Sequence, residues 1–458
     1  MTEFDRSRRA DQARDVAAVL TEQGVVGIAV TWVDTSGIAR VKAVPVARLP
    51  HAAAWGIGAS PVFDIFLHDD SLVRGRFAGG PVGDLRLYPD LDRLTRFAVA
   101  HGWAWAPADR YDQDGAVHPL DARGLARREV ERLAAQALSV RAAIEVEWCV
   151  SSGTGDEFIP AGAGPAYGMA RLSALPDYLR DVLAALATAG LVVEQIHPEY
   201  AAGQYEVSVA AEDPVGAADS SVLVREVIRA LSARHGLRAT FAPKVLAGGV
   251  GNGGHVHLSL WRDGTNLMSG GDRAYGLTGI GESFIGGILT RLPALLAIGA
   301  PSAGSYLRLV PSHWAGAFAC WGRENREAAV RLVTGSVGER ATAANVEVKC
   351  FDLAANPYLL MAALLAAGRA GIAEELRLPD PVEVDPAGLD EADRAARGIA
   401  PLPGTLSRAV EAFESDPVLA EALGPQLIDT VAVVRRGELA LFEGATDEDI
   451  VERTRWRY

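Results

Sequence analysis

Acidic residues and histidines recur at every second position in stretches that otherwise read as β-strands. Glu145 and Glu147 stand in AAIEVEWCV (142–150), and His255 and His257 stand in GHVHLSL (254–260). Side chains two residues apart in a strand point to the same face of a sheet, so each pair would present two polar groups together. Two carboxylates that share a dry site repel, and one pKa rises unless a cation lies between them.

Further acidic residues extend this pattern. Glu199 and Glu206 flank the turn in HPEYAAGQYE, and Glu347 stands two residues before Lys349 in NVEVKCFD. Each feature alone is more typical of a solvated strand face or a surface ion pair. Together on the strands of one domain, they would form a concave wall of oxygen and imidazole groups, which hard cations such as Mg²⁺ and Mn²⁺ prefer. The candidate metal ligands are Glu145, Glu147, Glu199, Glu206, His255 and Glu347.

Arginines supply a complementary set of cations. Arg308 lies in SYLRLVP, and Arg326 and Arg331 lie five residues apart in GRENREAAVRLV. Each could be a surface salt-bridge partner, but a planar guanidinium also suits carboxylates and phosphates. Beside metal-binding carboxylates, these arginines indicate phosphoryl transfer rather than redox chemistry. The glycine-rich run 248–255, which includes Gly251, lacks the strand-to-helix context of a dinucleotide fingerprint and favours close backbone approach to a small substrate.

The surrounding elements predict an α+β protein of two domains. Residues 1–112 read as a small mixed β-sheet domain with a hairpin at 27–46 and strands within 85–94 and 103–115. Residues 113–458 alternate helix, strand and strand, which favours a largely antiparallel sheet flanked by helices. Helices are expected at 119–138, 175–190, 222–236 and 355–376, with more helix at 404–425 and 426–442, and 377–403 is expected to be a surface loop.

Composition narrows the classes of partner. The 458 residues carry 44 basic and 58 acidic side chains, a net charge of −14. That balance argues against nucleic-acid binding and against docking on anionic membranes. The N-terminal residues lack the apolar stretch of a secretory signal, and no uninterrupted apolar run reaches the roughly 18 residues of a spanning helix. The three cysteines are far apart in the sequence, which predicts a reducing, cytoplasmic setting.

The order of these motifs resembles the glutamine synthetase family, type I. The order runs Glu-x-Glu, His-Pro-Glu…Gly-Gln-x-Glu, Gly-x-His-x-His-x-Ser, Arg-Leu-x-Pro, Asn-Arg and Val-Glu-Val, and it ends in ANPYLLMAALLAAG (355–368). The resemblance covers nearly the whole chain. It implies a β-grasp-like N-terminal domain, a catalytic domain, ATP, two or three Mg²⁺ or Mn²⁺ ions per site, and a homo-oligomer, a dodecamer in the family, with sites shared between neighbours.

The resemblance also implies a role for each candidate residue. Glu147, Glu199 and Glu206 would hold one metal, and Glu145, His255 and Glu347 a second beside the ATP phosphates. The candidate catalytic residues are Arg326, Arg331 and Glu199; the candidate substrate-binding residues are Arg308, Lys349, Gly251, Trp314 and Tyr167; and the candidate nucleotide-binding residues are His257, Ser259 and Arg331. In the family's reaction, glutamate is phosphorylated on its side chain by ATP, and an amine then displaces phosphate.

Departures from the family pattern point to an amine larger than ammonia. Trp314 stands where ammonia-using members carry a flap glutamate, and residues 57–60 lack their ammonium-binding aspartate. Lys349 replaces an arginine and Val250 an asparagine near the glutamate site, and 377–403 contains no tyrosine for adenylylation. The departures resemble γ-glutamylamine ligases that act on ethanolamine, polyamines or alkylamines, with ethanolamine slightly favoured. The alternatives are an ammonia-using glutamine synthetase and a non-catalytic assembly protein on the same fold.

Overall fold

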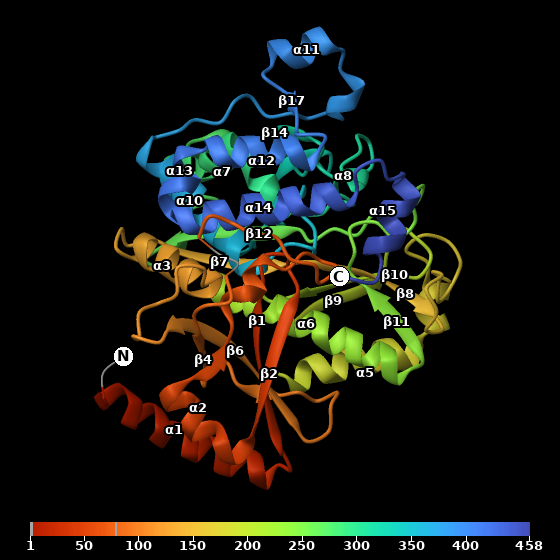
Figure 1. Ribbon diagram of the computed structural model, residues 1–458. Coiled ribbons are helices and arrows are strands. Elements are labelled where there is room, and N and C mark those ends of the chain that lie inside the picture. The colour runs from red at the N-terminus through yellow and green to blue at the C-terminus, as the bar shows by residue number, and fades with distance from the viewer. Residues whose placement is uncertain (1–2, 78–79) are drawn as a thin grey trace.

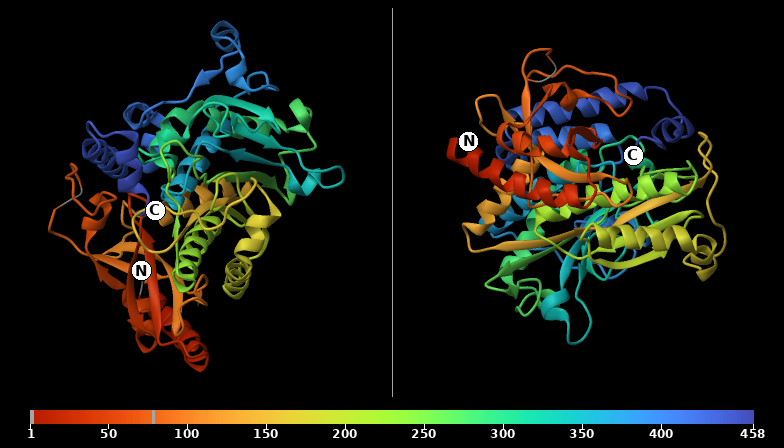
Figure 2. Two further views of the ribbon diagram at one scale, coloured as in Figure 1. Left: turned by 90° about the vertical axis from the view of Figure 1, so that its right-hand side faces the viewer. Right: turned by 90° about the horizontal axis from the view of Figure 1, so that it is seen from below.

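The computed structural model describes residues 3–77 and 80–458, and its first sheet lies within the first 112 residues. The strand order is β2-β1-β6-β4-β3, with β5 added beside β6. Its elements are α1 (Glu3–Glu22), β1 (Gly27–Val33), β2 (Ala39–Pro45), α2 (Leu49–Trp55), β3 (Ile57–Ala59), β4 (Leu85–Pro89), β5 (Thr95–Arg96) and β6 (Trp103–Asp112). The predicted hairpin is confirmed, because β1 and β2 pair antiparallel around the turn at Asp34–Gly37. This sheet forms one end of the molecule (Figures 1 and 2).

A separate hydrophobic core supports the predicted boundary after residue 112, which stays a prediction. Residues such as Ile28 and Leu87 pack together in this core, whereas Val33, Val99 and Trp105 pack into the larger core with the later residues. The amphipathic pattern of residues 11–24 predicts a helix that ends at Gly24, and the observed helix begins earlier, at Glu3, and runs to Glu22.

Two further sheets build the rest of the chain, and every strand pair in them is antiparallel except β14 with β15. The four-stranded sheet has the order β11-β8-β10-β9, and the seven-stranded sheet has the order β13-β12-β16-β15-β14-β17, with β7 beside β12. The strands are β7 (Ser139–Ile144), β8 (Val146–Ser152), β9 (Val193–Pro198), β10 (Gln204–Val209), β11 (Leu237–Thr240), β12 (Val256–Arg262), β13 (Thr265–Asn266), β14 (Phe318–Arg323), β15 (Ala328–Val333), β16 (Asn345–Val348) and β17 (Ala400–Pro401).

The prediction of one continuous strand over residues 142–150 is wrong. The chain leaves the seven-stranded sheet after Ile144 and enters the four-stranded sheet at Val146, so Glu145 stands at the junction. There its N–H donates to the carbonyl of His255, 2.9 Å away, which continues the β7–β12 register by one residue. Alternation of apolar residues continues through such a crossover, and the sequence pattern therefore cannot detect it.

Helices cover these sheets and form the centre of the larger core. They are α3 (Ala122–Ala134), α4 (Met169–Ala174), α5 (Pro176–Thr188), α6 (Pro214–Arg234), α7 (Gly279–Gly299), α8 (Ser305–Arg308), α9 (Arg340–Ala343), α10 (Pro357–Ala373), α11 (Glu391–Ala396), α12 (Leu406–Ser415), α13 (Pro417–Leu423), α14 (Pro425–Leu441) and α15 (Asp447–Thr454). α7 could cross a membrane by length and apolarity alone, but 83% of its most apolar window is buried, as in a core helix. The predicted loop 377–403 contains α11 and β17 and projects at the top of Figure 1.

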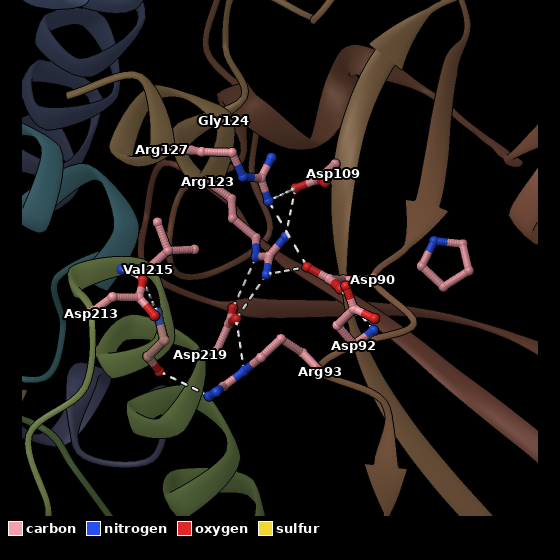
Figure 3. A network of polar contacts seen from close by, with 12 residues as sticks. Asp90, Asp92, Arg93, Asp109, Arg123, Gly124, Arg127, Asp213, Val215 and Asp219 are labelled. Carbon is pink, nitrogen blue, oxygen red and sulfur yellow. Dashed lines mark hydrogen bonds and ion pairs between the residues drawn. The ribbon is translucent and has the colours of Figure 1, made fainter. Parts of the chain in front are cut away.

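A buried network of ion pairs joins the first sheet to the helices of the larger part (Figure 3). Arg123 of α3 lies at its centre and contacts Asp90, which follows β4, and Asp109 of β6. It also makes two hydrogen bonds to Asp219 of α6, at 3.0 and 2.8 Å. Arg123 and Asp219 are almost fully buried, so this network fixes how the first sheet sits on the rest of the chain.

Candidate active site

One cluster of candidate ligands lies where β12 and β16 meet the junction between β7 and β8. Nδ1 of His255 lies 3.0 Å from Oε2 of Glu145 and 3.2 Å from Oε1 of Glu347. Ligand atoms of these three residues all lie within 4.8 Å of one another, close enough to hold one metal ion. His257, opposite Glu347 in the β12–β16 register, places Nε2 3.1 Å from Oε1 of Glu145.

A second cluster comes from β9, β10 and the turn between them. His197, Glu199 and Glu206 also place ligand atoms within 4.8 Å of one another. Nε2 of His197 lies 3.3 Å from Oε1 of Glu206, and Nδ1 lies 3.6 Å from Oε1 of Glu199. The Tyr167 ring lies 6.3 Å from the His197 ring. Sequence reasoning missed His197, although it directly precedes Pro198-Glu199 and faces Glu206 across the hairpin.

Glu147 lies between the two clusters and belongs to neither three-residue group. Its Oε2 accepts hydrogen bonds from the Gly253 N–H at 2.8 Å and from Gln204 at 3.2 Å. Its Oε1 lies 3.8 Å from Nε2 of His255, and its backbone lies opposite Glu206 in the β8–β10 pair. The predicted ligand sets are therefore brought together in one wall, and the assignment of Glu147 to one ion stays a prediction.

The electrostatics of this wall are those of a site built for cations. Burial, together with the charges of Glu147 and Glu206, raises the pKa of Glu199 to about 7. The hydrogen bond to Glu206 raises the pKa of His197 to about 9. Burial opposes a charge on His257, but Glu145 raises its pKa to about 9. In the described residues, protons on histidine thus balance carboxylate charge that divalent cations could balance instead.

Three cationic side chains surround the first cluster. Lys349 lies 3.0 Å from Oε1 of Glu347, and Arg331 on β15 lies 3.0 Å from Oε2 of the same carboxylate. Arg308, at the end of α8, donates to the Lys349 carbonyl at 3.0 Å and lies 3.1 Å from His255. Nη1 of Arg308 and Nε of Arg331 are buried without a hydrogen-bond partner among the described residues. Unpaired guanidinium N–H groups beside a wall of carboxylates suit an anionic substrate.

The remaining candidate residues differ in whether they lie beside the metal-ligand wall. Gly251 lies against Arg308, where a side-chain carbon would meet the arginine's aliphatic stem. Ser259 is buried in β12, where its hydroxyl accepts a hydrogen bond from Trp261. Arg326 and Trp314 are exposed and line a separate cavity, so the described structure does not bring them onto the metal-ligand wall.

Comparison with known proteins identifies the family. The model of the glutamine synthetase catalytic domain matches residues 119–454. The chain belongs to the glutamine synthetase family. It is 57% identical to the γ-glutamylpolyamine synthetase GlnA3 of Streptomyces coelicolor over 99% of this chain and 98% of the relative. It is also 32% identical to the glutamine synthetase of Pyrococcus abyssi over 86% of this chain and 85% of that enzyme.

Comparison with solved structures supports the same family. A crystal structure described as a novel glutamine synthase homolog is 36% identical, with a TM-score of 0.85, over 95% of this chain and 99% of the other. A GmaS/ADP complex is 27% identical, with a TM-score of 0.83, over 94% and 96% of the two chains. The chain is an ATP-dependent carbon–nitrogen ligase of the glutamine synthetase family. Enzymes of this family use ATP and divalent metal ions, and the carboxylate and imidazole wall fits such ions.

A methyl group at Gly253 would enter this wall directly. A Cβ there would overlap Nε2 of His255 and would come within 2.9 Å of both Oε1 of Glu147 and Nη2 of Arg308. We expect Gly253→Ala to displace these side chains and weaken Mn²⁺ binding by ~10–100-fold, the effect typical of disturbed support around metal ligands. Calorimetric titration of Mn²⁺ measures the change. Gly155→Ala is the matched control, because a Cβ there meets nothing within 4 Å. Equal Mn²⁺ affinity of both variants would contradict the assignment of this wall as a metal site.

Proposed function

We propose that the chain joins a polyamine to the side-chain carboxylate of glutamate at the expense of ATP. The observation that carries this proposal is the 57% identity, over nearly the full length of both chains, to a γ-glutamylpolyamine synthetase. The same observation favours polyamines over the ethanolamine expected from the sequence. The loss of two acidic groups expected around ammonium, with Trp314 in place of one, supports an organic amine over ammonia.

Two groups of residues are proposed to hold Mg²⁺ or Mn²⁺, two or three ions in all. Glu145, His255 and Glu347 would form one site, and Glu199 and Glu206 would form another together with Glu147 or His197. When bound, the metal neutralises negative charge on the phosphate oxygens. His257 and Ser259 are proposed to lie near the nucleotide, by resemblance to the family.

The proposed reaction proceeds in two displacements. The glutamate carboxylate oxygen attacks the γ-phosphorus of ATP, ADP leaves, and γ-glutamyl phosphate forms. The free amine nitrogen then attacks the acyl carbon, phosphate leaves, and Glu199 accepts the proton that the amine loses. Arg308 would bind glutamate, and its unpartnered Nη1 supports this role. Arg326 and Arg331 would stabilise the transferred phosphoryl group by charge-assisted hydrogen bonds.

The remaining substrate contacts follow from the same proposal. Lys349 and Gly251 lie beside Arg308 and would line the glutamate pocket. Tyr167 would lie near the second ion through its contact with His197. We also propose a cytoplasmic homo-oligomer, a dodecamer by resemblance, which sedimentation velocity of the purified chain tests.

Phosphate release tests the proposed reaction. The purified chain is given ATP, Mg²⁺ and glutamate with ammonia, ethanolamine, putrescine, spermidine or isopropylamine in turn. The proposal predicts release with putrescine or spermidine well above release with the other three. Release with ammonia alone would make the chain an ordinary glutamine synthetase. Release with ethanolamine alone would restore the first expectation.

Trp314 is predicted to set the preference between ammonia and larger amines. It is 54% exposed and lies where ammonia-using relatives are expected to carry a glutamate, so Trp314→Glu should restore an anionic group for ammonium. We expect the ratio of kcat/KM for ammonia to that for putrescine to rise by ~10-fold or more. Trp55→Glu is the control, because Trp55 is 51% exposed but lies on α2. An unchanged ratio in Trp314→Glu would show that Trp314 does not set the amine preference.

A further inference from the structure

A cavity of about 480 Å³ lies between the Trp314 loop, the turn before β15 and the segment that follows Val382. Trp314 forms one side, and carboxylates of Glu327, Glu383 and Asp385 line the others. The two walls are fixed to each other, because the Asn325 amide donates to the carbonyls of Val382 and Val384 at 2.8 and 3.1 Å. The cavity is therefore a formed feature of the fold.

Glu327 is the unusual member of this lining. Its side chain is buried, with 7% of the residue exposed, and Oε1 accepts a hydrogen bond from the Trp314 N–H at 2.8 Å. Oε2 is buried and makes no close hydrogen bond among the described residues, although the backbone N–H of Ser312 also favours the charged form of this carboxyl. Burial raises the pKa of Glu327, with the charge of Asp385 acting in the same direction. A buried carboxylate oxygen without a partner is costly, and a ligand carrying a positive charge would remove that cost.

The two arginines of the cavity leave this position open. Arg323 lies over the Tyr275 ring, 4.9 Å from its centre, and is held there. Arg326 is exposed. Four carboxylates line the cavity against these two arginines, so the lining as a whole favours a cation.

The cavity lies beside the candidate reaction centre. Glu324, which also lines it, accepts a hydrogen bond from Arg331 at 2.7 Å, and the same arginine contacts Glu347 of the metal-ligand wall. Glu327 and Glu324 line the same cavity, so its lining extends from the buried Glu327 to the carboxylate that holds Arg331.

We propose that Glu327, with Glu383 and Asp385, binds the distal ammonium group of a di- or polyamine whose other end is glutamylated. Trp314 lies beside the path of the chain, where its ring would cover methylene groups and attract the cation. This inference rests on the proposed polyamine ligase and assigns it a residue that selects a second positive charge. The site distinguishes putrescine from n-butylamine, which has the same four-carbon chain but carries no distal charge.

The test compares Glu327→Gln with the unmodified chain on putrescine and n-butylamine. Glutamine keeps an oxygen that can accept the Trp314 N–H, so the loop stays held while the charge is lost. We expect kcat/KM for putrescine to fall by ~10-fold or more, mainly through KM, and kcat/KM for butylamine to change by less than ~2-fold. Calorimetric binding of putrescine should weaken in parallel. Glu383→Gln should act in the same direction with a smaller effect, and the exposed Glu421→Gln should change nothing.

Several outcomes would overturn the proposal. Equal losses with putrescine and butylamine would show that Glu327 only holds the Trp314 loop. Unchanged putrescine kinetics and binding would show that its charge is not used. An unmodified chain that uses butylamine but neither uses nor binds putrescine would refute the polyamine substrate itself, and the distal site with it.

Discussion

Glu347→Gln should abolish most ligase activity, lowering kcat by ~10³-fold, the upper range for losing one group that stabilises developing charge. Glu347 is the point where the described site converges, because its carboxylate contacts His255, Lys349 and Arg331 at 3.0–3.2 Å. Glutamine matches its shape but cannot neutralise these cations or bind a metal as an anion. The measurement is the rate of phosphate release at saturating glutamate, amine and ATP, with Mn²⁺ binding measured calorimetrically on the same preparation.

Two controls separate chemistry from folding in this experiment. Glu421→Gln removes an exposed carboxylate on α13 and should leave kcat unchanged. Thermal melting and sedimentation of Glu347→Gln establish whether the variant keeps its fold and its assembly. A folded Glu347→Gln chain with full activity would remove Glu347 from the metal site.

Asp219→Ala should destabilise the folded chain by ~3–5 kcal/mol, the cost typical of breaking a buried ion pair by deleting one partner. Asp219 has no exposed surface and accepts hydrogen bonds from Arg123 at 2.8 and 3.0 Å and from the Tyr358 hydroxyl at 2.7 Å. Arg93 lies 3.3 Å from the same carboxylate. Loss of the Asp219 carboxylate leaves the buried Arg123 with too little negative charge around it. Urea unfolding followed by fluorescence measures the change in the free energy of unfolding.

Asp177→Ala is the matched control for this prediction. Asp177 pairs with Arg180 on the surface of α5, where both side chains are mostly exposed. Such pairs contribute ~0–1 kcal/mol, so the variant should unfold at nearly the same urea concentration as the unmodified chain. If the two variants lose the same stability, the network in Figure 3 does not fix the first sheet to the helices.

Local features of the fold could be predicted because they depend on neighbouring residues. The β1–β2 hairpin follows from two β-rich runs around Asp34–Gly37, and α1, α5 and α6 each end two residues before a glycine with positive φ, at Gly24, Gly190 and Gly236. The sheet order could not be predicted, because it pairs strands far apart in the sequence, such as β7 with β12. The crossover at Glu145 escaped for the same reason, since it exchanges one long-range partner for another.

The candidate site shows the same division. Alternating Glu and His residues indicated strands that carry ligands, and the structure places Glu145, His255 and Glu347 in one cluster. His197 was missed because a lone histidine beside a proline carries no periodic signal. Nothing in the sequence indicated the proposed ammonium site, because Glu327, Glu383 and Asp385 line one cavity only in the folded chain.

A competition between two amines measures which one the chain joins to glutamate. The unmodified chain is incubated with ATP, Mg²⁺, glutamate and equal concentrations of putrescine and ammonium. The products are then separated, identified and quantified by mass spectrometry. We expect γ-glutamylputrescine to exceed glutamine by a wide margin, with one phosphate released for each amide formed. Glutamine as the main product would contradict this expectation.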